Sequence, residues 1–595
     1  MSAATNAVGG AVQWNAPVNQ PRVEYPVGRS RCPDETQYST FRVLCVSRIH
    51  GIDLWSRWLG LGIARVAGVI SGEVGAARAA LIRGDSALIA SICHLAFGRA
   101  RLGLPGGQND LYRFLALFAG AYVVAISIMR WPSPAWNDML EAWAWGSRLQ
   151  LGYHKHPPFY SWVTYAWFQI FPRADWAFYL LSMTNVVVGL LGVWQLSGLF
   201  ALASPARVLS VALLTVTPPY NLMASNYGAD TALLSIWPWA AYAFVRSISE
   251  RSTRHAVLFG ALSAVALLSK YYSIVLLASC FAAALLHPAR DAYFTWYGPY
   301  LSIAVCTVLC LPHVWWALGE GAPTVQYALE RMRAGRGWPY RAFQGLAVGA
   351  ASVVVLAVPI AALVFALGRR RVSYILQAPR RAFRNVPLWL YALALGPGVL
   401  TVLLSLVGVA TIILNFFIPN YFLLPLVIML GIGGLFTTRR AQTAMLPAVV
   451  FPVLAILTAP VIAYGTVALH IKETGDVTAD VARLARDIWH REVGGPVHII
   501  GGSKSYALAG AFYLPEAPKF LSNFSLHESP WISKRQIRRD GMLVICERLD
   551  SRCPADARAL TKQSPKVFKA SAQRSFVGAR GERHDVTILV IPPTD

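Results

Sequence analysis

Eleven apolar runs follow one another between residues 112 and 470, and most of them have nearly the length that crosses a bilayer. A chain in lipid must satisfy its own backbone hydrogen bonds, so each run predicts an α-helix. We therefore expect a polytopic α-helical membrane protein with about eleven transmembrane helices, of which the third is the least secure. The predicted spans are Tyr112–Met129, Trp176–Phe200, Val208–Val216, Asp230–Val245, His255–Ser269, Tyr272–Leu286, Trp296–Leu318, Phe343–Leu367, Leu388–Val407, Tyr421–Phe436 and Thr443–Leu469.

The composition supports a membrane protein and argues against a nucleic-acid partner. Apolar residues make up 55% of the 595 residues and charged residues only 14%, with a mean hydropathy of +0.46, too apolar for a soluble chain of this length. The formal net charge is +24. No basic run alternates with aromatic residues on a soluble module, so this charge indicates membrane topology and not nucleic-acid binding.

Positive residues alternate between the loops in a way that predicts the orientation. The loops assigned to the cytoplasm contain many arginines, whereas the short outer loops after spans three, five and nine contain only Lys270. This asymmetry predicts a cytoplasmic N-terminus. The outer segment at 319–339 breaks the trend with Arg331, Arg333 and Arg336. Positive charge on the outer side needs another explanation, and a bound anion supplies one.

The two ends of the chain differ in character. Residues 1–111 lack a run long enough to span, since Arg65 interrupts one run and Ser86–Phe97 is too short. We expect an interfacial amphipathic helix on the cytoplasmic face, a weakly ordered extension, or a start codon assigned too far upstream. Residues 471–595 are less apolar and predict an extracytoplasmic α/β domain. Its predicted elements are a helix at Thr478–Trp489 and strands at Pro496–Ile500, Met542–Cys546 and Val586–Ile591. Cys546 and Cys553 lie there, either free or joined in a small disulfide loop.

The first outer loop, residues 130–175, gathers acidic and basic side chains in a chain that has few acids. Asp138 and Glu141 are spaced to share one face of a helix. About fifteen residues later come Tyr153, Lys155 and His156, followed by two prolines that end one helix and can start another. We expect the chemistry to lie in this loop.

Three further ionisable residues lie at outer ends of predicted spans, where such groups are costly and often functional. Asp230 begins the fourth span, Lys270 ends the fifth and His313 lies near the end of the seventh. Each has a structural alternative: a helix N-terminal dipole partner for Asp230, a snorkelling side chain for Lys270, and a hydrogen-bonding structural role for His313. Together with the first loop, they place every notable ionisable group on one side of the membrane.

Transfer of a sugar from a lipid phosphate needs both kinds of group at such a place. A carboxylate takes the proton of the attacking hydroxyl, and cationic side chains stabilise the departing phosphate. A long apolar donor tail also explains why the site lies among membrane helices. A transporter or flippase would instead spread its charges to the bilayer midplane and to both sides, and a non-catalytic scaffold would use only its outer domain.

The order of these motifs resembles the C-type glycosyltransferases, in particular the bacterial branch related to protein O-mannosyltransferases and lipid A aminoarabinose transferases. The resemblance covers roughly residues 112–590. The family's acidic residue after the first span matches Asp138, and its Gly-Tyr-x-x-Lys/His-Pro-Pro stretch matches residues 152–158. Further matches are Asn226 with Asp230, Lys270 with Tyr271, and the SPWIS sequence at Ser529–Ser533 with Gly541.

The sequence departs from the family pattern at two points. Many relatives have adjacent Asp and Glu, whereas here the second acid is displaced to Glu141, so Asp138 is the expected general base and Glu141 a second, less certain catalytic carboxylate. The aminoarabinose transferases have Glu-Lys where this chain has Lys155 and His156. The metal ligand carried by that Glu is missing, and whether a divalent metal is needed stays open.

The resemblance implies an inverting transferase that uses a polyprenyl-phosphate sugar donor on the periplasmic side of the bacterial inner membrane. The acceptor in relatives is lipid A, lipopolysaccharide core, another lipid or a protein hydroxyl, and nothing in the sequence selects one. Asp230 is a second acidic site, and the expected donor phosphate-binding residues are Tyr153, Lys155, His156, Lys270, Arg331 and Arg333.

Overall fold

The computed structural model describes residues 108–131, 133–333, 337–368, 386–471, 476–548 and 550–594. The predicted N-terminal extension therefore lies almost wholly outside the described residues. The first described helix, α3 (Gln108–Met129), begins four residues before the first predicted span.

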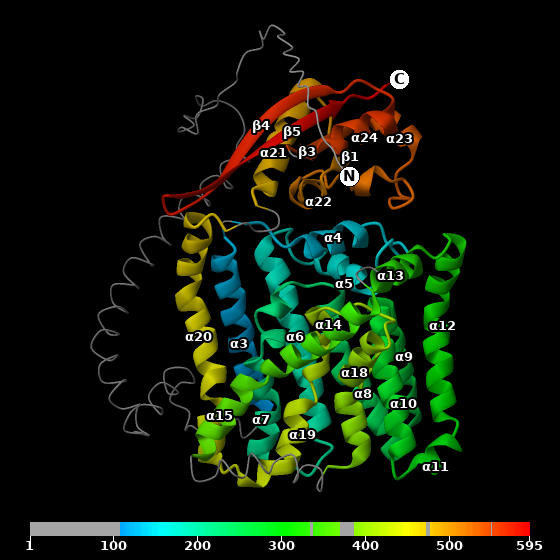
Figure 1. Cartoon of the computed structure of the whole chain (residues 1–595), viewed down its shortest axis with the longest axis vertical. Helices are drawn as coiled ribbons and strands as arrows, with labels where there is room; N and C mark the ends of the chain where they lie inside the picture. Colours follow the sequence, from blue (N-terminus) through cyan, green and yellow to red (C-terminus); the bar gives the residue numbers. More distant parts are fainter. Residues whose placement is uncertain are drawn as a thin grey trace, which may run out of the picture. The chain divides into compact units, whose positions relative to one another are not determined.

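Each of the eleven predicted runs is helical, and Figure 1 shows the helices packed side by side in one bundle. The helices of the predicted runs after α3 are α6 (Asp175–Ser197), α7 (Ser204–Thr215), α8 (Ala229–Glu250), α9 (Thr253–Ser269), α10 (Ile274–Leu286), α12 (Gly298–Gly319), α14 (Trp338–Val354), α15 (Ala357–Leu367), α18 (Leu388–Leu406), α19 (Leu424–Ile432) and α20 (Thr438–Ala468). Neighbours in the bundle include α3 with α6, α6 with α8, α8 with α9, α9 with α12, and α10 with α18.

Fewer than eleven of the described helices are long and apolar enough to cross a membrane. In the described part of the chain, six helices are long and apolar enough, or up to eight if each bent pair forms one span. The bends follow α7, where the short helices at Pro218–Ser225 turn by 84°, and precede α19, where η5 (Leu414–Tyr421) turns by 45°. Prolines that cannot donate a backbone hydrogen bond lie in both turns. Helices α9 and α10 are shorter than a span.

The breaks between short helices place polar residues at one end of the bundle. Helix α9 ends at Ser269 and α10 begins at Ile274, with Lys270 in an extended conformation between them. Asp230 lies in the first turn of α8, directly after the extended Gly228. Backbone that leaves the helical conformation within a membrane protein is tolerated where it is buried or lines a cavity.

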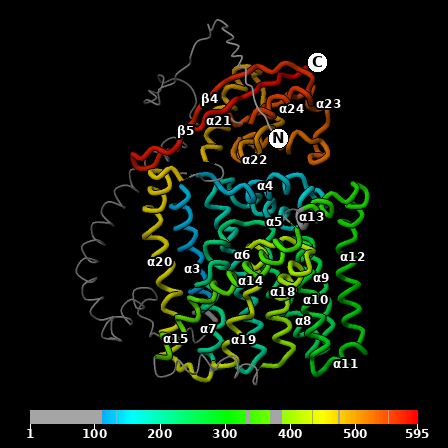
Figure 2. The backbone as a smooth tube through the Cα atoms, in the orientation of Figure 1, coloured from blue at the N-terminus to red at the C-terminus, as the bar shows by residue number. Residues whose placement is uncertain are grey.

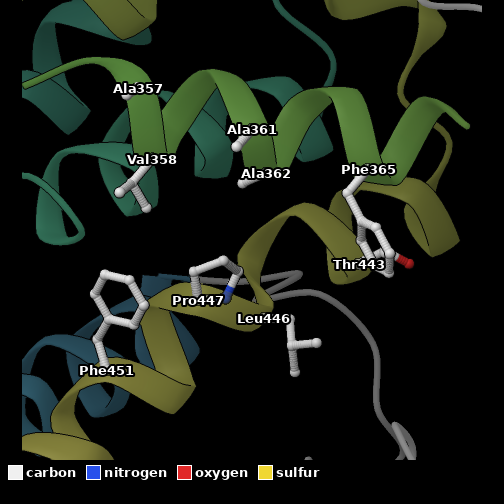
Figure 3. Close-up of a pocket in the computed structure, with 9 residues that line it drawn as sticks. All are labelled: Ala357, Val358, Ala361, Ala362, Phe365, Thr443, Leu446, Pro447 and Phe451. Atoms are coloured by element: carbon white, nitrogen blue, oxygen red, sulfur yellow. The ribbon is translucent and has the colours of Figure 1, made fainter. Parts of the chain in front are cut away.

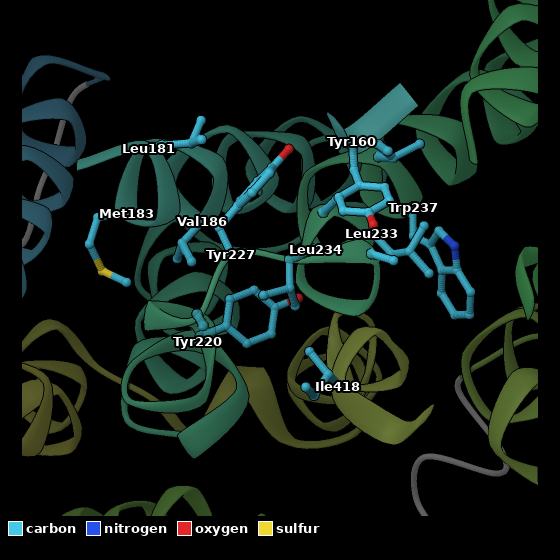
Figure 4. Packing of buried hydrophobic residues seen from close by; sticks show 14 of the residues in the cluster. Tyr160, Leu181, Met183, Val186, Tyr220, Tyr227, Leu233, Leu234, Trp237 and Ile418 are labelled. Carbon is cyan, nitrogen blue, oxygen red and sulfur yellow. The ribbon is translucent and has the colours of Figure 1, made fainter. Parts of the chain in front are cut away.

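Buried apolar side chains fill the bundle between these polar residues. Figure 4 shows Tyr220, Tyr227 and Leu234 packed with Val186 and Trp237 in one cluster. Helices α6 and α8 approach so closely that a Cβ atom at Gly189 would lie 2.1 Å from the Leu234 carbonyl oxygen. Close approach of this kind depends on small residues.

The C-terminal region is an α/β structure built on a five-stranded sheet with the order β2-β1-β3-β5-β4. Strand β1 pairs in parallel with β2 and with the central β3, whereas β5 pairs antiparallel with β3 and β4. The strands are β1 (Ile499–Gly502), β2 (Lys519–Phe520), β3 (Met542–Glu547), β4 (Lys566–Phe576) and β5 (Ala579–Ile591); the helices are α21 (Thr478–Glu492), α22 (Lys504–Tyr513), α23 (Lys534–Asp540) and α24 (Arg552–Thr561). The three predicted strands and the predicted helix are present, and Cys546 forms a disulfide with Cys553.

This region belongs to the same compact unit as the helical bundle. Arg574 of β4 is buried and donates hydrogen bonds to Asp476 at 2.7 Å and to Ser133 at 2.6 Å. Tyr513 of α22 accepts a hydrogen bond from the Ala135 backbone at 2.9 Å and donates one to Asp175, the first residue of α6. These contacts fix α22 over the loop that follows α3.

Two short helices, α4 (Asn137–Gly146) and α5 (Phe159–Trp167), follow α3. Figure 2 traces the chain from α3 through α4 and α5 before it enters α6, with α22 on the other side of α4. The first outer loop is therefore packed against both the bundle and the sheet region.

An apolar groove of about 460 Å³ lies between α15 and α20. Figure 3 shows Phe365 and Ala361 of α15 facing Pro447 and Phe451 of α20 across it. None of the described residues that line this groove is ionisable, in contrast to the surroundings of α4.

Candidate active site

Helix α4 presents its two carboxylates to different surroundings. Asp138 lies in the first turn, where the helix dipole favours a negative charge, and its side chain is exposed. Glu141 lies one turn later and is only 4% exposed. The predicted pair thus shares a helix face, but only Asp138 is open to a ligand.

Asp138 faces the loop that precedes α8. Asn226 donates a long hydrogen bond of 3.5 Å to its carboxylate, and a Cβ atom at Gly228 would lie 3.8 Å from the Asp138 Cβ. In the described residues no lysine or arginine nitrogen forms an ion pair with Asp138. Protein atoms around the exposed carboxylate reduce its hydration, and this desolvation, followed by repulsion from Glu141, raises the pKa of Asp138. A raised pKa suits a general base.

Glu141 binds two lysines. The ammonium group of Lys155 donates to both of its carboxylate oxygens, at 2.9 and 3.0 Å, and the ammonium group of Lys504 lies 2.8 Å from one of them. Burial alone would lower the pKa of Lys155, but the charge of Glu141 outweighs it and the pKa is raised. Lys155 therefore stays protonated at neutral pH.

The turn that carries Tyr153 and Lys155 is held by aromatic packing and backbone hydrogen bonds. The Tyr153 ring stacks on Trp145 of α4 at 5.3 Å, and its backbone N–H donates to the His156 carbonyl at 3.1 Å. Thr324, in α13 (Pro323–Arg333), donates to the Tyr153 carbonyl at 2.7 Å. Helix α5 starts directly after Pro158, as the two prolines predict.

His156 lies among the rings of Trp145, Tyr160 and Tyr327. Burial, followed by the positive charges of Lys270, Lys155 and Lys504, holds the pKa of His156 well below its usual value. The imidazole is therefore neutral at pH 7, and it can contact an anion by donating an N–H but not by carrying charge. All three lysines are therefore close enough to the His156 ring for their charges to lower its pKa.

Lys270 and Asp230 form an ion pair at the breaks described above. Lys270 also lies 4.6 Å from the centre of the Phe416 ring, a cation–π contact. The side chains are 13% and 23% exposed, so the pair is mostly buried. Lys270 is thus fixed by its partners and does not snorkel to the surface.

An apolar groove of about 410 Å³ is lined by residues that lie on either side of Lys270 in the sequence, among them Leu268 and Tyr271. It runs between the end of α9 and α12, and its lining includes Leu268, Tyr271 and Val314. His313 also lines it but is engaged on both ring nitrogens, with the Tyr271 hydroxyl at 2.6 Å and the Leu151 carbonyl at 2.7 Å. These contacts give His313 the structural hydrogen-bonding role that was one of its two alternatives.

The structure brings most of the predicted site residues together. Asp138, Glu141, Lys155, His156, Tyr153, Asp230 and Lys270 lie around one outer end of the bundle. The side chains of Arg331 and Arg333, and the whole of Arg336, lie outside the described residues. Within the described residues, no group of three or more His, Cys, Asp or Glu side chains is placed to hold a metal ion.

Sequence reasoning missed Lys504, which reaches the site from α22. Ser505 beside it accepts a hydrogen bond of 2.7 Å from Asn137, the first residue of α4. A signal was present: Lys504 follows the Gly-Gly-Ser sequence at the end of β1, and the carboxyl ends of parallel strands are common ligand sites. The tyrosines around His156 carried no comparable signal.

Parts of the sequence match one protein-family model and known galacturonosyltransferases. Residues 155–316 match the family model described as dolichyl-phosphate-mannose-protein mannosyltransferase. The lipopolysaccharide core galacturonosyltransferase RgtB of Rhizobium johnstonii is 27% identical over 266 residues, which cover 44% of this chain and 53% of RgtB. The lipid A galacturonosyltransferase RgtD of the same organism is 26% identical over 204 residues, 32% of this chain and 40% of RgtD. The matches thus span about half of these relatives or less.

The crystal structure of ArnT from Cupriavidus metallidurans bound to undecaprenyl phosphate matches with a TM-score of 0.52 and 12% identity. The match covers 81% of this chain and 98% of ArnT, and at this identity it shows the fold. The sequence match at 155–316 and the shared fold confirm the resemblance drawn from the motifs: the chain is similar in part of its sequence to lipopolysaccharide-modifying galacturonosyltransferases and has the fold of ArnT.

Proposed function

We propose that this protein transfers a monosaccharide from a polyprenyl-phosphate donor to a hydroxyl group of an envelope acceptor. The observation that carries the proposal is the gathering of one exposed carboxylate, Asp138, with Lys155 and Lys270 at one end of a membrane bundle. Proton removal from a hydroxyl and stabilisation of a leaving phosphate require these two kinds of group.

In the proposed reaction Asp138 takes the proton of the acceptor hydroxyl. The acceptor oxygen attacks the anomeric carbon, the bond from that carbon to the phosphate oxygen breaks, and the lipid phosphate leaves with the bonding electrons. Lys270 and Lys155 stabilise its charge, and neutral His156 donates an N–H to it. A single displacement of this kind inverts the configuration at the anomeric carbon.

Glu141 holds the lysines in place in this scheme and is not a second base. Its carboxylate is buried and bound to two ammonium groups, so it has no free lone pair directed at a substrate. Tyr153 supports the turn through its stacking on Trp145. Asp230 likewise holds the ammonium group of Lys270 in place through their ion pair.

The apolar groove beside Lys270 supports a donor with a prenyl tail. A phosphate held at Lys270 would place the first isoprene units against Leu268 and Val314. The ArnT structure of the same fold has undecaprenyl phosphate bound, which favours this class of donor.

The relatives narrow the choice of sugar and acceptor. RgtB is named for the lipopolysaccharide core and RgtD for lipid A, and both are named as galacturonosyltransferases. We infer a galacturonosyl-type sugar, with lipid A or the lipopolysaccharide core as the first acceptors to test and another lipid or a protein hydroxyl after them.

We also infer that all eleven helical runs lie in the bacterial inner membrane, with the short and bent helices packed inside the bundle. The alternation of arginines supports a cytoplasmic N-terminus and a periplasmic α/β region. The Cys546–Cys553 disulfide fits an oxidising compartment. A transporter is the weaker alternative, because the ionisable cluster lies at one end of the bundle and not near its middle.

Mass spectrometry of envelope lipids and glycans from a deletion strain tests the proposal. We expect one sugar to be missing, to be restored by the wild-type chain, and not to be restored by Asp138→Asn. Asp480→Asn is a matched control, since Asp480 is likewise an exposed residue in the first turn of a helix, α21, but pairs with Arg483 and contacts none of the site residues named above. An unchanged glycan profile in the deletion strain, or full restoration by Asp138→Asn, would overturn the proposed function.

A further inference from the structure

The three lysines of the site differ in how far their charge is already balanced. Lys270 and Asp230 pair one to one and are mostly buried. Lys155 and Lys504 share the single carboxylate of Glu141. Two ammonium groups against one carboxylate leave one positive charge at this triad, which the neighbouring Asp138 balances only while it is deprotonated. When Asp138 takes up the acceptor proton, the unbalanced charge therefore lies at Glu141 and not at Lys270.

Within the triad, Lys504 is the cation that is open to a ligand. Its side chain is 35% exposed, whereas that of Lys155 is 23% exposed, bound to both oxygens of Glu141 and placed over the Trp145 ring at 5.7 Å. Lys504 contacts one oxygen only. It therefore retains donors that can reach a second anion without leaving Glu141.

Lys504 also comes from a different part of the fold than Lys270. It is the first residue of α22 in the α/β region, held there by the hydrogen bond between Ser505 and Asn137, whereas Lys270 lies at a break in the membrane helices next to the apolar groove. A donor whose phosphate lies at Lys270 and whose anomeric carbon lies near Asp138 would direct the far side of its sugar ring toward Lys504.

Resting on the function proposed above, we propose that Lys504 is the residue that selects an acidic sugar, by binding the carboxylate of a uronic-acid donor. The α/β region would then act in donor recognition, with Glu141 orienting Lys504 and the sugar carboxylate compensating the remaining positive charge of the triad. A neutral hexose would leave this charge uncompensated.

The chain contains a matched control for this lysine. Lys534 is the first residue of α23 and follows Ser533, as Lys504 is the first residue of α22 and follows Ser503. Lys534 is exposed and, among the described residues, has no ion pair. Replacing either lysine changes the net charge and the helix start in the same way, but only one of them lies in the site.

The test is equilibrium binding to the purified full-length chain in nanodiscs. The probes are synthetic undecaprenyl-phosphate galacturonic acid, undecaprenyl-phosphate galactose and undecaprenyl phosphate. We expect Lys504→Met to weaken the uronic donor about tenfold, as loss of a charged hydrogen bond does, and to leave the other two ligands within about twofold. Lys504→Arg should keep most of the affinity, and Lys534→Met should change nothing.

Equal weakening of all three ligands by Lys504→Met would overturn the inference, because Lys504 would then serve the phosphate or the fold. So would a wild-type chain that binds the galactose donor as tightly as the uronic donor. Unchanged binding of undecaprenyl phosphate confirms that the variant is folded. If the wild-type chain bound none of the three, the proposed donor class itself would fail, and the inference with it.

Discussion

Asp138 and Glu141 carry the same functional group one turn apart on the same short helix, yet their surroundings are opposite. Asp138 is exposed, faces Asn226 and Gly228, and has a raised pKa. Glu141 is buried and binds two ammonium groups. Partners contributed by other elements, and not the position on α4, therefore decide which of the two carboxylates can act on a substrate.

The two acids also act on one another. Glu141 raises the pKa of Asp138 by repulsion, whereas the lysines that Glu141 holds lower it. Glu141 thus holds Lys155 in place for the leaving phosphate. Its own negative charge also offsets part of the lowering of the Asp138 pKa by the two lysines. Substitution of either acid, or of a residue that contacts it, tests whether the two carboxylates have these separate roles.

The largest effect is expected for Asp138→Asn. Loss of a general base costs about a thousandfold in turnover, while the exposed, unpaired side chain adds little to the free energy of unfolding. Initial transfer rates and thermal unfolding curves check this. A turnover within tenfold of the wild-type value would give the base role to another group.

Glu141→Gln should show the reverse pattern, with stability affected first. It leaves Lys155 and Lys504 without their carboxylate; removing one partner of a largely buried ion pair costs roughly 2 kcal/mol after allowing for the partial exposure of the lysines. The unfolding midpoint measures this. Glu492→Gln breaks an exposed pair with Lys566 and should cost less than about 1 kcal/mol; equal losses would mean that Glu141 holds nothing special.

A shift of the pH–rate profile is a smaller effect. Asp138 acts as a base only when deprotonated, so turnover falls as the pH drops through its raised pKa. Lys504 lowers that pKa, and Lys504→Met should therefore move the acid limb of the turnover at saturating donor to higher pH. A limb that stays in place, or moves to lower pH, would contradict the proximity of the two groups. Lys534→Met provides the unshifted reference.

The smallest change is expected for Asn226→Ala. Its hydrogen bond to Asp138 is long, at 3.5 Å, so its loss should reduce turnover by only about twofold. Because this hydrogen bond lowers the pKa of Asp138, the acid limb should also move slightly to higher pH. A hundredfold loss would mean that Asn226 contacts the substrate directly.

The sequence was a good guide to the helices and a weaker guide to how they cross the membrane. Hydropathy located all eleven helical runs because burial in lipid and burial in a bundle both require apolar residues. It could not distinguish full spans from short helices such as α9 and α10, since Lys270 interrupts an otherwise continuous apolar stretch. The C-terminal strands β1, β3 and β5 were predicted from their buried residues, whereas β4 is mostly exposed and lacked this pattern.

The site was predictable in its members but not in its pairings. Scarcity of acids and their position in the first outer loop singled out Asp138 and Glu141, but only the fold shows that Glu141 meets Lys155 and Lys504. Lys504 lies 363 residues after Glu141 in the sequence, and no local pattern reports such a contact. The pairing of Lys270 with Asp230 likewise depends on how α8 and α9 pack.

The most direct test separates chemistry from binding in one preparation of Asp138→Asn. Single-turnover transfer is measured with the undecaprenyl-phosphate sugar that the wild-type chain uses, at saturation, alongside equilibrium binding of undecaprenyl phosphate. We predict binding within about twofold of the wild-type value and a transfer step slowed about a thousandfold. A transfer step near the wild-type rate, or binding and transfer lost in parallel, would contradict the assignment of Asp138 as the base beside a lysine-bound phosphate.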